Sequence, residues 1–265
     1  MHICLCQFWG RSMKIETYLI NLDGSHERLA RASAQLNEVG WEFERYPAFD
    51  GRGKALSDFK HYNDVKAQKI LGRSLLNSEI GCYLSHYGCI ENFLKTDADY
   101  LIVLEDDLKI SENFKSIMNE ILEHLHSDSK TEWHLVNIAA KKKKIAKDIA
   151  SINQYSLWHA YYFPIRGLGL IWSRKGAKAF LDSGREITVP VDIFFQNWLS
   201  ENGRGLGVWP ALVSPAGLDS DILGTIASQG VLRKQKEKRQ LFYRLKKQKR
   251  VFVNKLFAMK NYLFH

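Results

Sequence analysis

Apolar residues along the chain fall into two kinds of segment, short continuous runs and stretches that repeat every three or four positions. Residues 15–22, 43–49 and 100–104 are continuous runs rich in β-branched and aromatic side chains, which predict strands. Residues 26–39 and 78–96 carry apolar side chains at helical spacing and predict helices. This alternation of strands and helices is typical of an α/β fold.

The second half of the chain predicts further elements of both kinds. The expected helices are 111–126, 173–183 and 191–199, and the expected strands are 134–139, 155–163, 167–172 and 208–214. We expect the runs 155–163 and 167–172 to pair with each other. Residues 51–76 show no clean period and predict an irregular connection, while Lys141 to Lys144 predict a solvated loop.

The strongest strand signal ends abruptly in acidic residues. Residues 100–104 are continuously apolar, as expected for a central strand covered on both faces, and Glu105, Asp106 and Asp107 follow at once. In α/β proteins the carboxyl ends of strands meet where ligands bind. Clustered carboxylates repel one another unless a cation neutralises them, and Mg²⁺ or Mn²⁺ prefers such oxygen ligands. The alternative is a plain acidic loop that caps the helix beginning at Ser111.

Composition limits the class of protein. The chain has 265 residues, of which 45% are hydrophobic and 25% charged, so it can form one large core. No apolar run approaches the roughly 20 residues that span a bilayer, and residues 1–12 do not resemble a secretory signal. We therefore expect a cytosolic protein with reduced cysteines. The expected organisation is an extension at 1–12, a main domain at 13–230 and a tail at 231–265.

The positive charge lies in the tail. Residues 233–265 hold 12 Lys and Arg against one Glu, which leaves 26 basic and 28 acidic residues in the rest of the chain. The tail also carries an apolar stripe at helical spacing, made of Leu241, Leu245, Phe252, Leu256, Met259 and Leu263. Such a basic amphipathic helix suits an anionic membrane surface. Two alternatives are a helix packed on the body through this stripe and a nucleic-acid-binding arm.

Four segments, taken in order, resemble one family of enzymes. They are INLD with the following Arg28, ERYPAFDG at 44–51, SEIGCYLSH at 78–86 and LIVLEDD at 101–107. Weaker matches continue at 169–181, 190–192 and 220–222, so that the resemblance covers about residues 14–223. The chain resembles glycosyltransferase family 25, which includes galactosyltransferases of lipooligosaccharide biosynthesis and relatives of the collagen galactosyltransferase domain.

The resemblance implies an architecture and an activity. The implied fold is GT-A-like, with a mixed central sheet flanked by helices, and the implied donor is a UDP-hexose. We expect galactose to move from UDP-galactose to a lipid-linked lipooligosaccharide acceptor, with inversion and with the help of Mn²⁺ or Mg²⁺. UDP-glucose is the alternative donor. The enzyme would lie on the inner face of the cytoplasmic membrane, held by its tail, and would bind no nucleic acid.

Candidate roles in catalysis follow from this chemistry. Asp107, with Asp106 beside it, would hold the cation against the diphosphate, while Glu105 contributes to the donor site. Inversion needs a base that removes the proton of the acceptor hydroxyl, and Asp192 is the candidate. The alternative for Asp192 is an N-cap of the helix at 193–199.

Further residues are candidates for binding the donor. Arg28 could bind a phosphate through both of its terminal nitrogens, or it could pair on the surface with Glu27 or Glu42. Asn21, at the end of the first strand, is placed to contact uridine. Asp221 is expected to close over the donor or to contact the metal.

The role of His86 has two interpretations. Cys82, His86 and Cys89 share one helical face and could ligate zinc, but no fourth ligand is evident. We favour His86 near the donor pocket, in a structural or phosphate-facing role.

Two other functions remain as alternatives. A nucleotidyl-transfer enzyme could use the same acidic motif, but the chain lacks a GxxxxGK phosphate loop. A non-catalytic protein could keep the fold and bind RNA or lipid through the tail. The intact aspartate pair at 106 and 107 argues against this second alternative.

Overall fold

The computed structural model describes residues 13–217 and 243–264. Residues 1–12, Asp221 and Leu241, which carry some of the expectations above, lie outside the described residues. The strands are β1 (Ile15–Asn21), β2 (Glu44–Pro47), β3 (Tyr100–Glu105), β4 (Leu108–Ile110), β5 (Leu135–Asn137), β6 (Ala146–Ile152), β7 (Tyr155–Ala160), β8 (Gly169–Ser173), β9 (Gly205–Trp209) and β10 (Val213–Pro215). The helices are α1 (His26–Glu38), η1 (Leu56–Asp58), α2 (Asp64–Leu71), α3 (Asn77–Lys95), α4 (Phe114–Ser127), α5 (Arg174–Ser183), α6 (Val191–Asn202) and α9 (Tyr243–Phe264).

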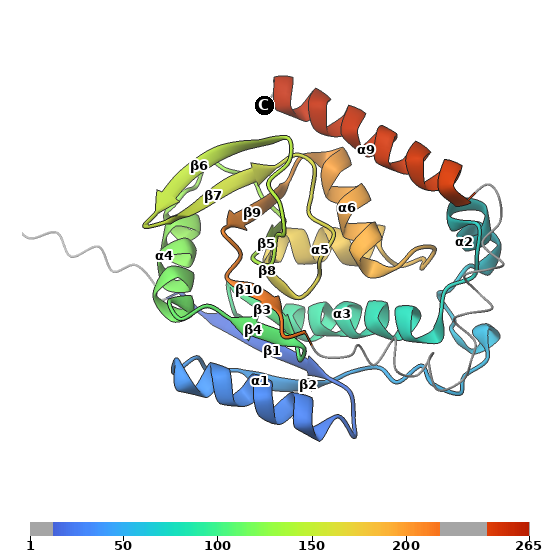
Figure 1. Ribbon diagram of the computed structural model, residues 1–265, viewed down its shortest axis with the longest axis horizontal. Helices are drawn as coiled ribbons and strands as arrows, with labels where there is room; N and C mark the ends of the chain where they lie inside the picture. The colour runs from blue at the N-terminus through green and yellow to red at the C-terminus, as the bar shows by residue number, and fades with distance from the viewer. Residues whose placement is uncertain (1–12, 218–242, 265) are drawn as a thin grey trace, which may run out of the picture.

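Eight strands form one mixed sheet in the order β2-β1-β3-β8-β5-β9-β7-β6 (Figure 1). Strand β1 runs parallel to β2 and β3, and β8 lies antiparallel between β3 and β5. Strand β9 is parallel to β5, and β7 and β6 complete the sheet as antiparallel neighbours. A separate small sheet pairs β4 with β10. The mixed α/β architecture expected from the sequence is therefore confirmed.

Strand β3 lies in the middle of the protein and contributes to two cores. Leu101 and Val103 pack in one core, and Ile102 and Leu104 pack in the other. Helices α3, α5 and α6 supply the first core, and α1 and α4 supply the second (Figure 1). Because both faces of β3 are covered, no position of the strand has to be polar, which explains its continuous apolar run.

Several expectations from the sequence need correction. Residues 51–76 are not an irregular connection, because they contain η1 and α2; Asn63 caps α2 by accepting a hydrogen bond from the Lys66 amide at 3.0 Å. The runs 155–163 and 167–172 do not pair with each other: β7 pairs with β6 and β9, whereas β8 lies between β3 and β5. Strand β6 was missed because it has exposed charged positions and lies at the sheet edge.

The last predicted strand, 208–214, is split in the structure. Strand β9 ends at Trp209 and belongs to the large sheet, whereas β10 begins at Val213 and pairs with β4. Pro210 lies between them and has no N–H to continue a ladder. This break carries the chain from the large sheet to the turn that follows β3.

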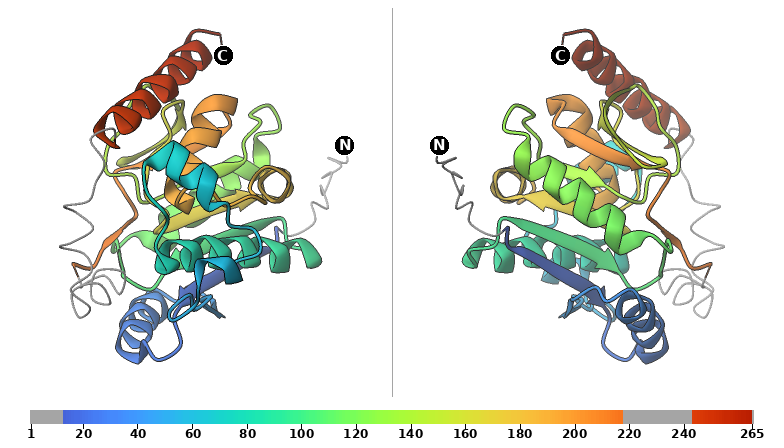
Figure 2. Two further views of the ribbon diagram at one scale, coloured as in Figure 1. Left: turned by 90° about the vertical axis from the view of Figure 1, so that its right-hand side faces the viewer. Right: turned by 90° about the vertical axis from the view of Figure 1, so that its left-hand side faces the viewer.

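Helix α9 confirms that the tail is helical and shows which face packs. It lies along α6 and α2, at the end of the protein opposite α1 (Figures 1 and 2). Its buried residues are Asn254, Ala258 and Asn261, so the expectation of a helix packed through its apolar stripe is wrong. Among the described residues, no helix is both long enough and apolar enough to cross a membrane.

Candidate functional site

The three acidic residues Glu105, Asp106 and Asp107 lie at the carboxyl end of the central strand β3, as the sequence predicted. Glu105 is the last residue of β3, and Asp106 and Asp107 form the turn to β4. The turn is held by the residue that follows β10, because the Ala216 amide donates to the Asp107 carbonyl at 2.7 Å. The sequence after β10 thus fixes the backbone that presents the acidic side chains.

Asp106 is buried and bound on both sides. The guanidinium of Arg28, from α1, lies 2.5 Å from its Oδ1, and the amide of Asn21, from the end of β1, donates to its Oδ2 at 2.7 Å. Arg28 therefore pairs with Asp106, not with Glu27 or Glu42 on the surface. Both oxygens of Asp106 therefore have a partner, which fixes the position of its carboxylate, and binding of the cation by Asp106 stays a prediction.

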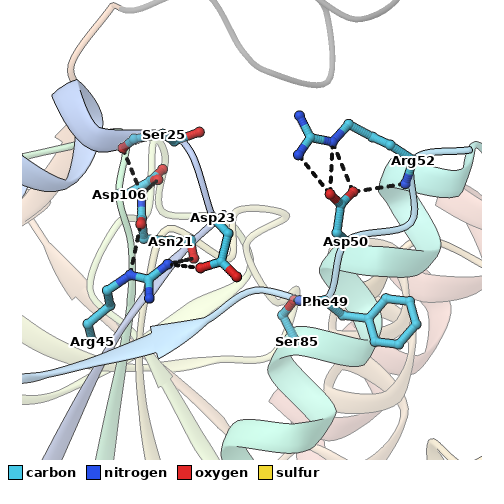
Figure 3. Close-up of polar contacts among 9 residues, drawn as sticks. All are labelled: Asn21, Asp23, Ser25, Arg45, Phe49, Asp50, Arg52, Ser85 and Asp106. Atoms are coloured by element: carbon cyan, nitrogen blue, oxygen red, sulfur yellow. Dashed lines mark hydrogen bonds and ion pairs between the residues drawn. The ribbon is translucent and has the colours of Figure 1, made fainter.

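Asn21 braces this part of the site. It is 2% exposed, and its side-chain amide also donates to the Ser25 carbonyl at 3.1 Å. Arg45, from β2, donates to Asn21 Oδ1 at 3.0 Å and pairs with Asp23, as Figure 3 shows. These contacts tie β1, β2 and the turn after β3 together, while contact of Asn21 with uridine stays a prediction.

Asp107 differs from Asp106 in having a carboxylate oxygen without a hydrogen-bond partner among the described residues. Its Oδ1 is buried and makes no hydrogen bond within the described part of the chain, and its Oδ2 is 4.0 Å from Arg28. Burial raises the pKa of Asp107 to about 6, and the negative charge of Glu105 adds to the increase. Burial and the charge of Glu105 thus both disfavour the ionised form of Asp107, and a cation beside it would offset both effects.

Glu105 joins His86 and Cys82 of α3. His86 is 1% exposed, and its Nε2 lies within hydrogen-bond distance of Glu105 Oε1, at 3.0 Å. The Cys82 thiol donates to the same oxygen at 3.8 Å. Cys89, by contrast, lies in the hydrophobic core, so it does not belong with the other two as a zinc ligand.

Cys82, His86 and Glu105 offer ligand atoms within 4.8 Å of one another, a spacing that could hold a metal ion. Burial raises the pKa of the Cys82 thiol well above its ordinary value, and the charge of Glu105 adds to the increase. A protonated thiol is a hydrogen-bond donor and a poor metal ligand. Without a metal, the trio is a hydrogen-bonded cluster, and its ligand atoms are also close enough together to hold a metal ion.

Asp192, in the first turn of α6, lies close to Glu105. The helix begins at Val191 with Pro190 at the N-cap position, and no side-chain cap is formed. The capping alternative is therefore wrong, since Asp192 lies in the first turn and accepts a hydrogen bond from the Gly167 amide. Burial raises the pKa of Asp192 to about 8, and the charge of Glu105 adds to the increase.

Gly167 marks the point where these side chains meet. A methyl group on its Cα would lie 2.7 Å from Asp192 Oδ1, 3.4 Å from Glu105 Oε1 and 3.6 Å from His86 Nε2. The segment is held by the Asn137 side chain, which donates to the Arg166 carbonyl at 2.6 Å, and by the Glu105 amide, which donates to the Leu168 carbonyl at 3.1 Å. A side chain at position 167 would displace the carboxyl groups.

Helix α3 is pressed against the segment that follows β2. A methyl group on Gly81 would lie 2.6 Å from the Phe49 carbonyl oxygen, and Ser85 Oγ accepts from the Phe49 amide at 2.8 Å (Figure 3). Both contacts join the ERYPAFDG segment to the SEIGCYLSH segment. This packing sets the position of His86 relative to Glu105.

The structure thus brings together most of the residues that the sequence singled out. Glu105, Asp192 and His86 meet at Gly167, and Asp107 lies near Glu105. Arg28 and Asn21 bind Asp106, and Asp221 lies outside the described residues. Sequence reasoning missed the parts played by Arg45 and Gly167. Arg45 lies inside the ERYPAFDG segment, which could have suggested it, whereas nothing local distinguishes Gly167 from other loop glycines.

Comparison with known proteins gives one family. The profile of glycosyltransferase family 25 (LPS biosynthesis protein) matches residues 14–195. A glycosyltransferase 25 family member of Aedes aegypti is 29% identical over 73% of this chain and 34% of its own length. Human procollagen galactosyltransferase 2 is 26% identical over 68% of this chain and 29% of its own length. A relative from Rattus norvegicus, 27% identical over 56% of this chain and 27% of its own length, is described as a probable inactive family member 3.

Solved structures resemble the fold only at a distance. A glycosyltransferase involved in glycosylation of the major capsid of PBCV-1 is 12% identical with a TM-score of 0.41, over 78% of this chain and 95% of that one. The galactosyltransferase LgtC is 11% identical with a TM-score of 0.37, over 77% and 87% of the two chains. The assignment therefore rests on the sequence profile, which covers more than half of a chain that spans about a third of the curated relatives it matches. By that match, the chain belongs to glycosyltransferase family 25.

Proposed function

We propose that the protein transfers a hexose, galactose from UDP-galactose, to a lipid-linked oligosaccharide of the lipooligosaccharide type, with inversion. One observation carries the proposal: the carboxyl groups of Asp107 and Asp192 both lie close to Glu105 at the end of β3, and Asp192 and Glu105 meet at Gly167. An inverting transfer needs a charge-neutralising group on the donor side and a base on the acceptor side.

The donor side fits a hard divalent cation, Mn²⁺ or Mg²⁺. Asp107 offers a buried oxygen with no hydrogen bond in the described structure. Burial, with the charge of Glu105, raises its pKa, and a bound cation would stabilise the ionised carboxylate against both effects. A bound cation would offset the negative charge that develops on the departing diphosphate. Arg28 adds a second positive charge, held in place by Asp106 at 2.5 Å.

The acceptor side fits Asp192 as the general base. Its carboxylate takes the proton of the acceptor hydroxyl while that oxygen bonds to the anomeric carbon. The bond from this carbon to the diphosphate oxygen breaks, and UDP leaves with the electron pair. A pKa of about 8 makes Asp192 a stronger base than an ordinary aspartate, and the Gly167 amide holds its carboxyl group in position.

The identity of the substrates is supported by the relatives. Procollagen galactosyltransferases are among them, and the family description names LPS biosynthesis. A lipid-linked acceptor would place the protein on the cytosolic face of the cytoplasmic membrane. UDP-glucose is the alternative donor, because discrimination between the two sugars depends on the contacts of one hydroxyl group.

The test is release of UDP from UDP-galactose and UDP-glucose, with and without Mn²⁺ and without an acceptor. We expect Mn²⁺ to stimulate turnover of one of the two donors in the wild type. Asp107→Ala should reduce this turnover by about a hundredfold or more. The matched control is Asp182→Ala, an exposed aspartate at the end of α5, which should behave as wild type. Equal turnover in Asp107→Ala and wild type would contradict the assignment.

A second candidate is a non-catalytic family member, since two relatives are described as inactive or probably inactive. It predicts no metal-dependent turnover of either donor in the wild type. The same assay therefore separates the two functions.

A further inference from the structure

Helix α9 turns its apolar residues away from the body of the protein. Among the described residues, twelve large hydrophobic side chains are exposed, and seven of them lie on this helix. They are Leu245, Phe252, Leu256, Met259, Tyr262, Leu263 and Phe264. Single exposed apolar residues are common on soluble proteins, but a concentrated group of this kind is typical of a surface that binds a membrane, another protein or a ligand.

The helix docks through polar and small residues on its opposite side. Asn254 donates to the Asn197 side chain at 2.7 Å, and Asn261 donates to the carbonyls of Ser200 and Glu201 at 3.0 and 3.1 Å. Ala258 is fully buried between them. Hydrogen bonds to α6 therefore fix the rotation of α9 about its own axis, so the outward face is set by the fold.

The outward face is a narrow stripe. At about 100° per residue, Leu245, Phe252, Leu256, Met259 and Leu263 fall within about 60° of one another and opposite Asn254 and Asn261. This geometry gives the stripe the length of nearly the whole helix. A stripe of this shape can be buried to a shallow depth along a flat apolar surface.

Charge identifies the kind of surface. The 22 residues of α9 include seven Lys and Arg and no Asp or Glu. At the same 100° spacing, Arg244 and Lys255 flank the stripe on one side, and Lys249 and Lys260 flank it on the other. Long basic side chains beside an apolar stripe can reach upward to phosphate groups while the stripe enters the lipid.

A second basic segment lies next to the helix. Lys144 is stacked over the ring of Tyr162, with Nζ 5.3 Å from the ring centroid, and Tyr162 and Ile145 pack against Ala258. This contact brings the Lys141–Lys144 loop beside α9. The loop adds positive charge, since Lys141, Lys142 and Lys144 are exposed.

From these observations we propose that α9 lies flat in the interface of an anionic lipid bilayer, with its stripe inserted and its flanking lysines and arginines on the lipid headgroups. Anionic lipid complements the charge of the helix, and an apolar interior complements the stripe. The inference does not depend on the identity of the donor or on catalysis. It gives the protein a fixed orientation on the membrane, because α9 is hydrogen-bonded to the catalytic domain.

The test is co-sedimentation of the full chain with vesicles of phosphatidylcholine alone and of phosphatidylcholine with phosphatidylglycerol. We expect binding to the anionic vesicles only, and weaker binding at high salt. Phe252→Ser combined with Leu256→Ser should weaken binding by about tenfold or more, since each lost side chain removes apolar burial. The control is Val65→Ser combined with Ile70→Ser, which removes two exposed apolar side chains from α2 and should bind as wild type.

A charge pair of variants tests the headgroup contacts. Lys255→Gln combined with Lys260→Gln should weaken binding by about tenfold to thirtyfold, at roughly 1 kcal/mol per cation. Lys130→Gln combined with Lys178→Gln removes the same charge from exposed positions elsewhere and should have little effect. Thermal unfolding of each variant should match wild type, because the changed residues do not face the body.

Three results would overturn the proposal. Binding to neutral and anionic vesicles alike would remove the role of charge. Unchanged vesicle binding in the stripe variant would remove the role of α9. Concentration-dependent dimers that the stripe variant abolishes, without vesicle binding in the wild type, would show that a second copy of the chain covers the stripe. In all cases donor turnover in the variants provides the separate check on catalysis.

Discussion

Glu105 is the electrostatic centre of the site. Its charge adds to the raised pKa of Asp107 and to that of Asp192, after burial, which is the larger cause at both residues. Its own carboxylate is held by His86 at 3.0 Å and faces Cys82 at 3.8 Å. Three carboxyl groups around one point cannot all ionise without cost, so the site is arranged either to bind a cation or to hold a proton.

Asp192→Asn tests the proton-accepting role. The amide is nearly the same size and can still accept from the Gly167 amide, but it cannot take a proton from the acceptor. We expect the transfer rate to fall by about 10² to 10⁴ while donor affinity changes by a few-fold. The rising limb of the pH–rate profile near pH 8 should also disappear, because the pKa of Asp192 is about 8.

The measurement is kcat and donor affinity at several pH values, with the exposed Asp182→Asn as the matched control. If Asp192→Asn retained a near-wild-type rate, the base would have to be another residue.

Gly167→Ala tests how closely the site is packed. The added methyl group would lie 2.7 Å from Asp192 Oδ1, closer than a carbon and an oxygen can approach. We expect the transfer rate to fall by about a hundredfold and the free energy of unfolding to fall by about 1–3 kcal/mol, as for other overpacked sites.

Gly53→Ala is the control for this change. Gly53 has a φ of +71° and nothing near its missing side chain, so alanine there should cost about 1 kcal/mol of stability and leave the rate unchanged. Equal activity of Gly167→Ala and Gly53→Ala, measured together with chemical unfolding, would show that the close approach has no functional role.

At the scale of elements, the tail helix α9 caps the C-terminal end of α6 with a side-chain amide. The last carbonyls of any α-helix lack partners within the helix, and in α6 the carbonyls of Ser200 and Glu201 accept from the Asn261 side chain. Gly203, with a φ of +70°, ends α6 in the left-handed conformation. A methyl group there would lie 3.1 Å from Asn261, so α9 packs directly over the end of α6.

Asn261→Leu should weaken this docking. The substitution keeps the size of the side chain but removes the donor, so the buried carbonyl of Ser200 and the partly buried carbonyl of Glu201 lose this partner, at a cost of about 1–3 kcal/mol. We expect faster amide hydrogen exchange in α9 and little change in β3, because the loss is local. Lys260→Leu, at a neighbouring exposed position, is the control and should leave exchange in α9 unchanged. Uniform destabilisation of the whole protein would instead show that α9 and the domain unfold together.

At the scale of the whole molecule, His134 lies where several elements meet. It precedes β5, its ring is stacked on Trp198 of α6 at 5.3 Å, and its Nε2 lies 3.4 Å from Arg204. Burial, helped by the charge of Arg204, lowers the pKa of His134 to about 4. The folded protein therefore holds this imidazole neutral.

This shift predicts how stability depends on pH. The unfolded chain binds a proton at His134 below about pH 6.5, whereas the folded chain does so only near pH 4. The contribution of this group is thus complete above pH 6.5 and is lost as the pH falls toward 4, with a limit of about 3 kcal/mol at roughly 1.4 kcal/mol per pKa unit.

His134→Phe keeps a ring on Trp198 and removes the titration. Its free energy of unfolding should fall less steeply than that of wild type between pH 6.5 and 4, as measured by urea unfolding at each pH. His26→Phe, at an exposed position, should follow the wild-type curve. Parallel curves for His134→Phe and wild type would contradict the prediction.

The sequence by itself determined the order of most elements and the place of the acidic cluster. These features depend on neighbouring residues: the apolar run of β3 needs two covered faces, and Glu105, Asp106 and Asp107 follow it directly. Strands β7 and β8 are consecutive in the chain but pair with other strands. Strand pairing depends on contacts between distant segments, so the local pattern could not reveal it.

Tertiary structure alone decided the partners of each side chain. Arg28 and Asp106 are 78 positions apart, and Gly167 reaches Asp192, Glu105 and His86 from three different elements. Tertiary contacts also decided which face of α9 packs against the domain. Asn254 and Asn261 of α9 donate hydrogen bonds to carbonyls and to a side-chain amide of α6, whereas the apolar stripe of α9 stays exposed. The hydrophobic pattern shows that a helix has an apolar stripe, but the contacts of the folded chain decide which face of the helix is buried.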